Sequence, residues 1–270
     1  MAEFEELEPT FVSVTYGAGG GTREKTIRLV LRLVREAKLN TVPHLTCIGH
    51  SVEEIDSILQ QYAEAGISSI LALRGDAPAN PPDEWSPDGV FSNAAGLVRH
   101  IKQFGERNNF PFTIGVAGFP EGHPDTPNSL KHMDHLKEKV DQGADWICTQ
   151  LFFNNNAFHD WRERVQLSRI DIPVLAGVMP ISSAEGLHRM ADLAGGTVFP
   201  APLLKAIERC DGDKEAVAEI GVHWATEQCR DLLDHDVDGI HFYTLNKSDA
   251  TKRIHRSLGV KTFRSLREGS

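Results

Sequence analysis

The stretch Ile70-Leu71-Ala72-Leu73-Arg74-Gly75-Asp76 decides the fold class of this chain. Its first four residues form a short apolar run, typical of a buried strand, which stops at a cation, a glycine and a carboxylate. In α/β proteins, ligands bind at the carboxyl ends of parallel strands. The stretch therefore predicts a buried strand that ends at a binding position. A purely structural ion pair between Arg74 and Asp76 is the alternative.

Similar apolar runs recur along the chain and alternate with segments of helical periodicity. Strands are expected at residues 11–16, 41–47, 69–73, 112–117, 146–153, 173–178 and 239–245. Helices are expected at residues 22–37, 52–65, 94–105, 129–142, 156–167 and 183–193, with two more within 197–235. This order predicts an α/β protein with a mainly parallel sheet. Polar and glycine residues gather after the strands, as in a TIM-type barrel with its site on one face.

Seven strands are one fewer than a closed (β/α)8 barrel needs. Residues 2–7 resemble the end of a helix, so we expect a (β/α)8 barrel whose first βα unit is incomplete, in a single domain over residues 1–270. An open barrel leaves two unpaired strand edges, which suggests an upstream segment of about 25 to 40 residues, the size of one βα unit. We also expect a homo-oligomer, and a long polar loop at residues 77–93.

The composition argues against several classes of function. The net charge is −10 and the basic residues are scattered, so no nucleic-acid partner is expected. The four cysteines are widely spaced and form no CxxC pair, which suits a reducing, cytoplasmic location. No basic segment precedes an apolar one, and no apolar stretch approaches the roughly 20 residues that span a bilayer. We therefore expect neither export nor a membrane partner.

Two other strand ends carry groups suited to a ligand. The glycine-rich turn at residues 15–21 allows close approach of a flat or phosphorylated ligand, but it matches neither GxGxxG nor a P-loop. A plain flexible turn explains it equally well. His44 lies inside an apolar run, where an imidazole needs either a ligand or a core partner.

Two later segments offer further polar candidates. Prolines on both sides of Glu121 and His123 predict a stiff loop that presents one of these side chains, or else a rigid surface turn. Gln150 offers an amide that both donates and accepts hydrogen bonds. Phe152 and Phe153 beside it suit either a planar heterocycle or core packing.

The sequence contains no clear pattern for a metal site or for a catalytic nucleophile. His132 and His135 are three residues apart on an expected helix, but no third ligand has suitable spacing, so we expect no metal site. No Ser-His-Asp or Cys-His arrangement can be inferred, and the glycines fit no kinase pattern.

Five motifs stand in one collinear series. They read Phe-Val-Ser-Val-Thr-Tyr-Gly at 11–17, Pro-His-Leu-Thr-Cys at 43–47, Ala-Leu-Arg-Gly-Asp at 72–76, Thr-Gln-Leu-Phe-Phe at 149–153 and His-Phe-Tyr-Thr-Leu-Asn at 241–246. Together they resemble the methylenetetrahydrofolate reductase family over about residues 9–260. Five motifs in order make the resemblance far more specific than any single one.

The resemblance implies a (β/α)8 barrel that uses FAD to pass hydride from NAD(P)H to 5,10-methylenetetrahydrofolate, giving 5-methyltetrahydrofolate. Both substrates would use one flavin face in turn. By matching position, the implied cofactor-binding residues are Thr15, for the nicotinamide cofactor, and Tyr16, Ala18, His44, Arg74, Gly75, Asp76, His123 and Lys139, for FAD. The implied folate-binding residues are Asp76, Gln150 and Lys247.

Asp76 is the catalytic residue that the resemblance implies. A carboxylate beside the flavin disfavours the anionic reduced form and so makes it a better hydride donor, and it also accepts pterin N–H bonds. Its implied role is to tune hydride transfer. The family's proton donor is a glutamate on the first strand, a position before the start of this sequence. The alternative is therefore a non-catalytic or impaired flavin- or folate-binding homologue.

Several positions depart from the family pattern. Phe119, His132, His135 and Glu138 stand where the family often has Tyr, Asp, Asn and Arg against FAD, and Lys247 stands where Arg is common. Gly186 stands where a glutamine can contact folate. A flavin-free barrel of another class, such as an aldolase with a Schiff base on Lys247, is a more distant reading.

Overall fold

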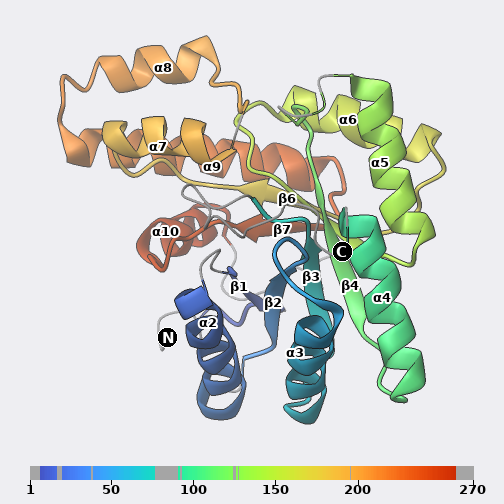
Figure 1. Ribbon diagram of the computed structural model, residues 1–270. Coiled ribbons are helices and arrows are strands. Elements are labelled where there is room, and N and C mark those ends of the chain that lie inside the picture. Colours follow the sequence, from blue (N-terminus) through green and yellow to red (C-terminus); the bar gives the residue numbers. More distant parts are fainter. Residues whose placement is uncertain are drawn as a thin grey trace, which may run out of the picture. The chain divides into compact units, whose positions relative to one another are not determined.

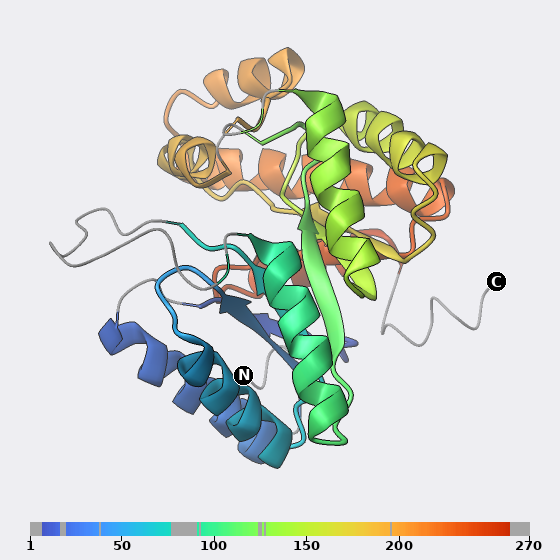
Figure 2. The same cartoon turned by 45° about the vertical axis from the view of Figure 1, so that its right-hand side comes forward.

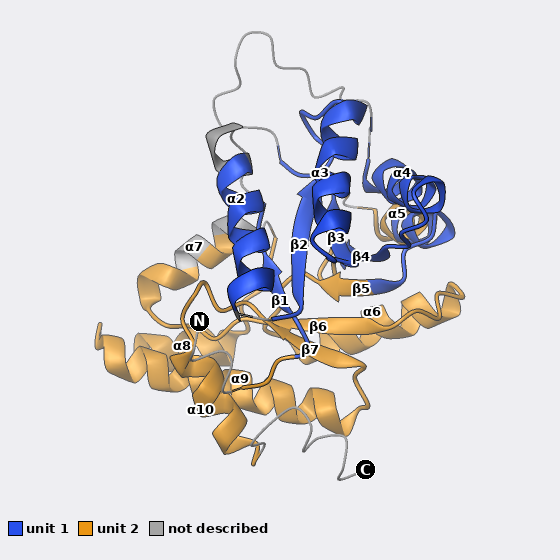
Figure 3. Cartoon of the chain, turned by 90° about the horizontal axis from the view of Figure 1, so that it is seen from below, with its two compact units in different colours: residues 1, 10–117, 135–146 blue, residues 2–9, 118–134, 147–270 orange. Residues whose placement is uncertain are grey.

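The computed structural model describes residues 7–16, 20–37, 39–76, 91, 93–123, 126, 128–194 and 196–259. The chain divides into two compact units, shown in different colours in Figure 3. Unit 1 contains residues 10–117 and 135–146, and unit 2 contains residues 2–9, 118–134 and 147–270. The expected loop at residues 77–93 lies outside the described residues, apart from Phe91 and Asn93.

Unit 1 is built on parallel strands. They are β1 (Val12–Val14), β2 (Thr41–Thr46), β3 (Ser69–Leu73) and β4 (Thr113–Gly118), whose last residue belongs to unit 2. Val12 pairs with Thr41, and His44 pairs with Leu71. The helices are α2 (Gly20–Arg32), continued by the π-helix η1 (Leu33–Ala37), α3 (Val52–Glu64) and α4 (Ala94–Arg107). Helices α3 and α4 lie side by side (Figures 1 and 2).

Local sequence explains where these elements begin and what they bury. Helix α3 starts at a capping box, in which the Ser51 side chain accepts from the Glu54 backbone and the Glu54 side chain accepts from Ser51. The helix buries one apolar face that includes Ile55 and Leu59. In β3, Ile70 is fully buried, which confirms the strand predicted from the apolar run.

Unit 2 continues the same βα pattern. Its strands are β5 (Trp146–Thr149, with Trp146 in unit 1), β6 (Val174–Val178) and β7 (Gly239–Phe242), and they are parallel. Its helices are α6 (Asn155–Leu167), α7 (Ala184–Ala194), α8 (Ala201–Glu208), α9 (Lys214–Asp234) and α10 (Asp249–Ser257). Helix α5 (Ser129–Asp141) begins in unit 2 and continues in unit 1. Helices α8 and α9 are the two extra helices predicted within residues 197–235.

Strand β5 is shorter than the predicted strand at residues 146–153. Beyond Thr149, the carbonyls of Phe152 and Phe153 accept hydrogen bonds from side chains of α9. The Gln228 amide donates to the Phe152 carbonyl at 3.0 Å, and the Trp224 indole donates to the Phe153 carbonyl at 3.1 Å. Side-chain partners therefore satisfy the polar backbone that a longer strand would have paired.

Two other strands also end early. The last predicted strand extended to residue 245, but β7 ends at Phe242. Leu245 and Asn246 have φ values of 47° and 63°, a left-handed conformation that no strand adopts. The first strand covers Val12–Val14 rather than the predicted residues 11–16.

Parallel strands alternate with helices, and the strand order is the chain order from β1 to β7. This is the βα repetition of a TIM-type barrel, and it confirms the predicted fold class. None of the described helices is both long and apolar enough to cross a bilayer.

Candidate functional site

Gly75 lies between the two charges that end β3. Its φ of 85° is in the left-handed region, which favours glycine. A Cβ on this residue would lie 2.7 Å from Ile48 Cγ2 and 2.8 Å from Thr46 Cβ. Packing against the end of β2 therefore requires the glycine, independently of any ligand.

The backbone beside Gly75 is held firmly. The Ile48 N–H donates to the Arg74 carbonyl at 3.0 Å, and the Cys47 N–H donates to the Leu73 carbonyl at 3.1 Å. The side chains of Arg74 and Asp76 are exposed on this rigid base. An ion pair between exposed charges contributes little stability.

Tyr16 follows β1 and is held by a histidine. The Tyr16 hydroxyl lies 2.9 Å from His50 Nε2, and the two ring centroids are 5.6 Å apart. His50 is buried, and its Nδ1 lies 3.2 Å from the Ile48 carbonyl. In the tautomer that donates from Nδ1 to this carbonyl, His50 Nε2 accepts a hydrogen bond from the Tyr16 hydroxyl. Sequence reasoning missed His50. Its position between the strand at residues 41–46 and the helix cap Ser51 places it in a βα loop, where ligand-binding residues are common.

Two other predicted residues of unit 1 belong to the neighbouring strands or to the residues just after them. Thr15 is exposed after β1, and His44 is half-buried on β2 opposite Leu71. Thr15, Tyr16 and the charged triplet thus lie at the carboxyl ends of β1 and β3, and His44 lies within β2, the strand that pairs with both. Ala18 lies outside the described residues.

Lys139 on α5 is held by a neutral partner. Its Nζ donates to the Ala117 carbonyl at 2.6 Å. Burial of the ammonium lowers the pKa of Lys139 to about 8. Among the described residues no carboxylate forms an ion pair with it, so its charge is available to an anionic ligand.

Unit 2 contains a cavity of about 290 Å³. Its lining includes Phe119, Glu121, His123, His132 and Trp161. The Phe119 ring makes edge contacts with both histidines, with centroid distances of 4.8 Å to His123 and 5.6 Å to His132. The structure thus brings the predicted residue His123 together with two positions that depart from the family pattern.

Two lining residues of this cavity have buried polar atoms without a hydrogen-bond partner in the described part of the chain. They are Glu121 Oε1 and Trp161 Nε1. The other Glu121 oxygen accepts from the Val198 N–H at 3.0 Å, while burial raises the pKa of the carboxyl group. An unpaired acceptor and an unpaired donor in one wall are suited to a polar ligand. Sequence reasoning missed Trp161, which reads as an ordinary apolar residue of a helix.

Gln150 and Lys247 follow β5 and β7 in unit 2. The Gln150 side-chain oxygen accepts from the Leu151 N–H at 2.9 Å, which leaves the amide NH2 as the group to donate. Lys247 is exposed. Near them, the Tyr243 hydroxyl donates to the Thr149 carbonyl at 2.9 Å and so ties the end of β7 to β5.

The predicted residues thus form two groups. Thr15, Tyr16, His44, Arg74, Gly75, Asp76 and Lys139 belong to unit 1, and His123, Gln150 and Lys247 belong to unit 2. His135 and Glu138, two further departures from the family pattern, are exposed on α5.

A solved structure supports the fold. It is an uncharacterized protein from Clostridium thermocellum, described as binding two copies of 5-methyl-5,6,7,8-tetrahydrofolic acid. It matches with a TM-score of 0.54 at 12% identity, over 93% of this chain and 94% of its own. At this identity the match shows a shared fold alone.

Curated relatives have much higher sequence identity. Methylenetetrahydrofolate reductase (NADH) 1 of Arabidopsis thaliana is 38% identical over 96% of this chain, which spans only 45% of that relative. The 5,10-methylenetetrahydrofolate reductase of Pectobacterium carotovorum is 35% identical over 94% of this chain and 82% of its own length. The family model for methylenetetrahydrofolate reductase matches residues 1–259. This chain belongs to the methylenetetrahydrofolate reductase family.

Proposed function

We propose that this chain reduces 5,10-methylenetetrahydrofolate to 5-methyltetrahydrofolate with hydride supplied by NAD(P)H through FAD. The observation that carries the proposal is the placement of Tyr16, Arg74 and Asp76 at the carboxyl ends of β1 and β3, the two strands that pair with β2, on which His44 lies. That face is where barrel enzymes place their sites, and these are the residues that match the family.

The residues of unit 1 fit a flavin dinucleotide. Within the described part of the chain, the partner of the Lys139 ammonium is a neutral carbonyl, so the charge suits a phosphate. The hydrogen bond between Tyr16 and His50 holds an aromatic ring that suits a flat ligand. When bound, FAD supplies the ability to accept a hydride and pass it on.

The chain's own groups then bind and orient the substrates. Asp76, exposed on a rigid base, accepts pterin N–H groups and disfavours negative charge beside it. Thr15 contacts the nicotinamide cofactor. Gln150 donates its amide NH2 to the folate, and Lys247 adds a cation for the folate carboxylates.

In unit 2, His123 takes part in cofactor binding. The cavity of about 290 Å³ beside it is small for a whole dinucleotide. Phe119 and His132 offer aromatic surface there, in place of the hydroxyl and carboxylate that the family often has. We therefore infer that FAD is held more by stacking, and less by ion pairing, than in other family members.

Stepwise reduction and reoxidation of the flavin tests the proposal. The purified protein is mixed with FAD without oxygen, and flavin absorbance is followed as NADH or NADPH is added. We expect bleaching, and then recovery when methylenetetrahydrofolate is added. An Asp76→Asn variant should bleach but recover more slowly. Bleaching that folate never reverses would overturn the proposal and favour an impaired homologue.

A further inference from the structure

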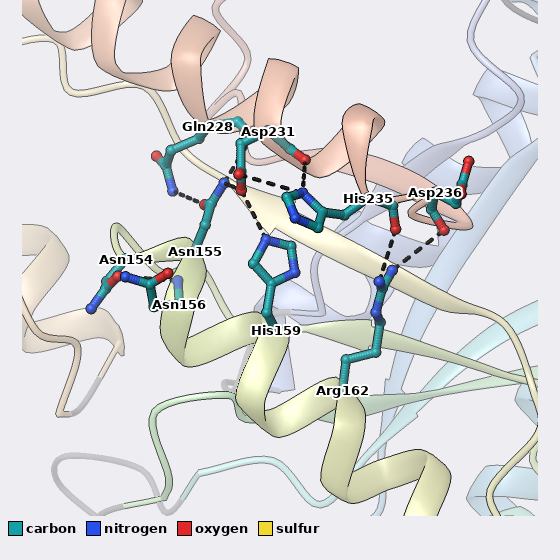
Figure 4. A network of polar contacts seen from close by, with 9 residues as sticks. All are labelled: Asn154, Asn155, Asn156, His159, Arg162, Gln228, Asp231, His235 and Asp236. Atoms are coloured by element: carbon teal, nitrogen blue, oxygen red, sulfur yellow. Dashed lines mark hydrogen bonds and ion pairs between the residues drawn. The ribbon is translucent and has the colours of Figure 1, made fainter.

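Helices α6 and α9 of unit 2 bring together two histidines and an aspartate, none of which belongs to the proposed flavin and folate sites (Figure 4). One possible ligand atom each from His159, Asp231 and His235 lies within 4.8 Å of the others. We propose that these three side chains bind a divalent transition-metal ion of the Zn²⁺ class.

The distances suit a single ion after small side-chain adjustments. His159 Nε2 lies 2.8 Å from Asp231 Oδ2, and His235 Nδ1 lies 3.4 Å from Asp231 Oδ1. His235 Nδ1 also lies 2.7 Å from the Asp231 backbone carbonyl, a contact that a metal bound at this nitrogen would replace. The two imidazole rings are 4.4 Å apart at their centroids. Zinc bonds nitrogen and carboxylate oxygen at about 2.0 to 2.2 Å, so an ion between the three groups needs them only slightly further apart.

The spacing along the chain is also favourable. Asp231 and His235 are four residues apart at the end of α9, so both side chains leave the same face. His159 comes from α6, opposite this face (Figure 4). Two ligands from one helix and one from another form a site that closes only when the helices pack together.

The electrostatics of this end of α9 favour a cation. The carboxyl end of a helix carries partial negative charge, and further aspartates follow at Asp234, Asp236 and Asp238. Arg162 is a nearby cation. Its guanidinium donates hydrogen bonds to the carbonyls of His235 and Asp236, at 2.8 and 3.3 Å.

The carboxylate of Asp231 is oriented by groups outside the three ligands. The Asn155 amide donates to Asp231 Oδ2 at 2.6 Å, and its oxygen accepts from Gln228 Nε2 at 3.1 Å (Figure 4). Such supporting hydrogen bonds fix ligand direction in metal sites. Three protein ligands leave a fourth position for water, and exposed His235 gives the ion access from solvent.

The preferred ion follows from the donor set. Two imidazoles and one carboxylate suit Zn²⁺, Co²⁺, Ni²⁺ or Cu²⁺, whereas Mg²⁺ prefers oxygen ligands only. Bound metal would clamp α6 to α9, and we expect it to raise thermal stability because only the folded chain presents the three groups together.

Calorimetric titration of the untagged, chelator-treated full chain with Zn²⁺ tests the site. We expect one ion per chain, and no binding of Mg²⁺. His159→Gln and Asp231→Asn should each weaken Zn²⁺ binding at least about ten-fold, and Asn155→Ala should weaken it by about ten-fold. The matched control His223→Gln alters an exposed histidine on the same helix and should leave affinity unchanged.

Circular dichroism shows whether each variant folds. If the variants fail to fold, the visible spectrum of the wild-type chain with Co²⁺ decides, because tetrahedral nitrogen and oxygen ligands give it strong absorption. The proposal is wrong if the wild-type chain binds no Zn²⁺, if folded His159→Gln binds it equally, or if Co²⁺ shows only its aqueous spectrum. The assay involves neither flavin nor folate, so its outcome is separate from that of the proposed reductase activity.

Discussion

At the scale of single residues, the charged triplet after β3 is shaped by a packing constraint as well as by chemistry. Gly75 is required by its φ of 85° and by the nearby atoms of Ile48 and Thr46. The family resemblance implies that Gly75 binds FAD. The structure shows that packing against Ile48 and Thr46 also requires the glycine.

Replacing Gly75 by alanine should destabilise the protein. The left-handed backbone costs an L-residue about 1 to 2 kcal/mol, and the contacts with Ile48 and Thr46 add to that cost. Gly66→Ala is the matched control, because its φ is 76° but nothing lies within 4 Å of its Cβ. Urea unfolding should give a larger loss for Gly75→Ala than for Gly66→Ala. Equal losses would show that the close contacts carry no cost.

Lys139 should make FAD binding depend on pH. Its pKa of about 8 means that the ammonium loses its proton as the pH rises through that value, and the attraction for a phosphate is then lost. We expect the affinity of the wild-type chain for FAD, measured by fluorescence quenching, to fall as the pH rises through about 8. In Lys139→Gln, affinity should be lower and nearly independent of pH there. An unchanged wild-type affinity across the range would contradict the role of Lys139.

The lowered pKa of Lys139 also makes the free energy of unfolding depend on pH. Because the pKa of Lys139 is lowered in the folded chain, the unfolded chain binds a proton more readily than the folded chain between about pH 8 and pH 10.5. The burial penalty of Lys139 is therefore fully present below about pH 8 and is relieved as the pH rises towards 10.5.

At the scale of elements, helical faces decide which side chains reach a ligand. On α5, Lys139 is bonded to Ala117, whereas the neighbouring Glu138 is exposed and negative where the family often has arginine. The element itself was readily predicted from its apolar periodicity, and its observed bounds differ from the prediction by one residue. Strand β5 was harder to predict, because α9 side chains end it.

Reversing the charge at Glu138 should strengthen FAD binding. Glu138→Arg removes a repulsive carboxylate and adds a cation suited to a pyrophosphate, so we expect affinity to rise several-fold. Glu163→Arg, the same charge change at an exposed residue of α6, should leave affinity unchanged. Equal effects of the two substitutions would show a general charge effect, and no effect of either would show that Glu138 lies away from the bound anion.

At the scale of the whole molecule, the βα order and the family were both evident from local patterns. The distribution of the predicted site residues over two compact units was not, and the single domain and the homo-oligomer stay predictions. Analytical ultracentrifugation of the full chain tests the oligomer.

FAD should stabilise the whole chain if it binds the folded state alone. At a free concentration of about one hundred times its dissociation constant, the expected gain in the free energy of unfolding is about 2.7 kcal/mol. Thermal unfolding followed by circular dichroism should show a higher midpoint with FAD, and a smaller rise for Lys139→Gln. A midpoint that FAD does not change at this concentration would mean that the folded chain is not its target.

The sequence by itself determined the alternation of strands and helices, the residues that follow each strand and the family, because periodicity and motif order are local properties. Only the tertiary structure decided which distant groups meet. The bond between Tyr16 and His50 spans 34 positions, and the bond between His159 and Asp231 spans 72. Such contacts arise when parallel pairing and helix packing bring separate segments together, and no short stretch of sequence carries a sign of them.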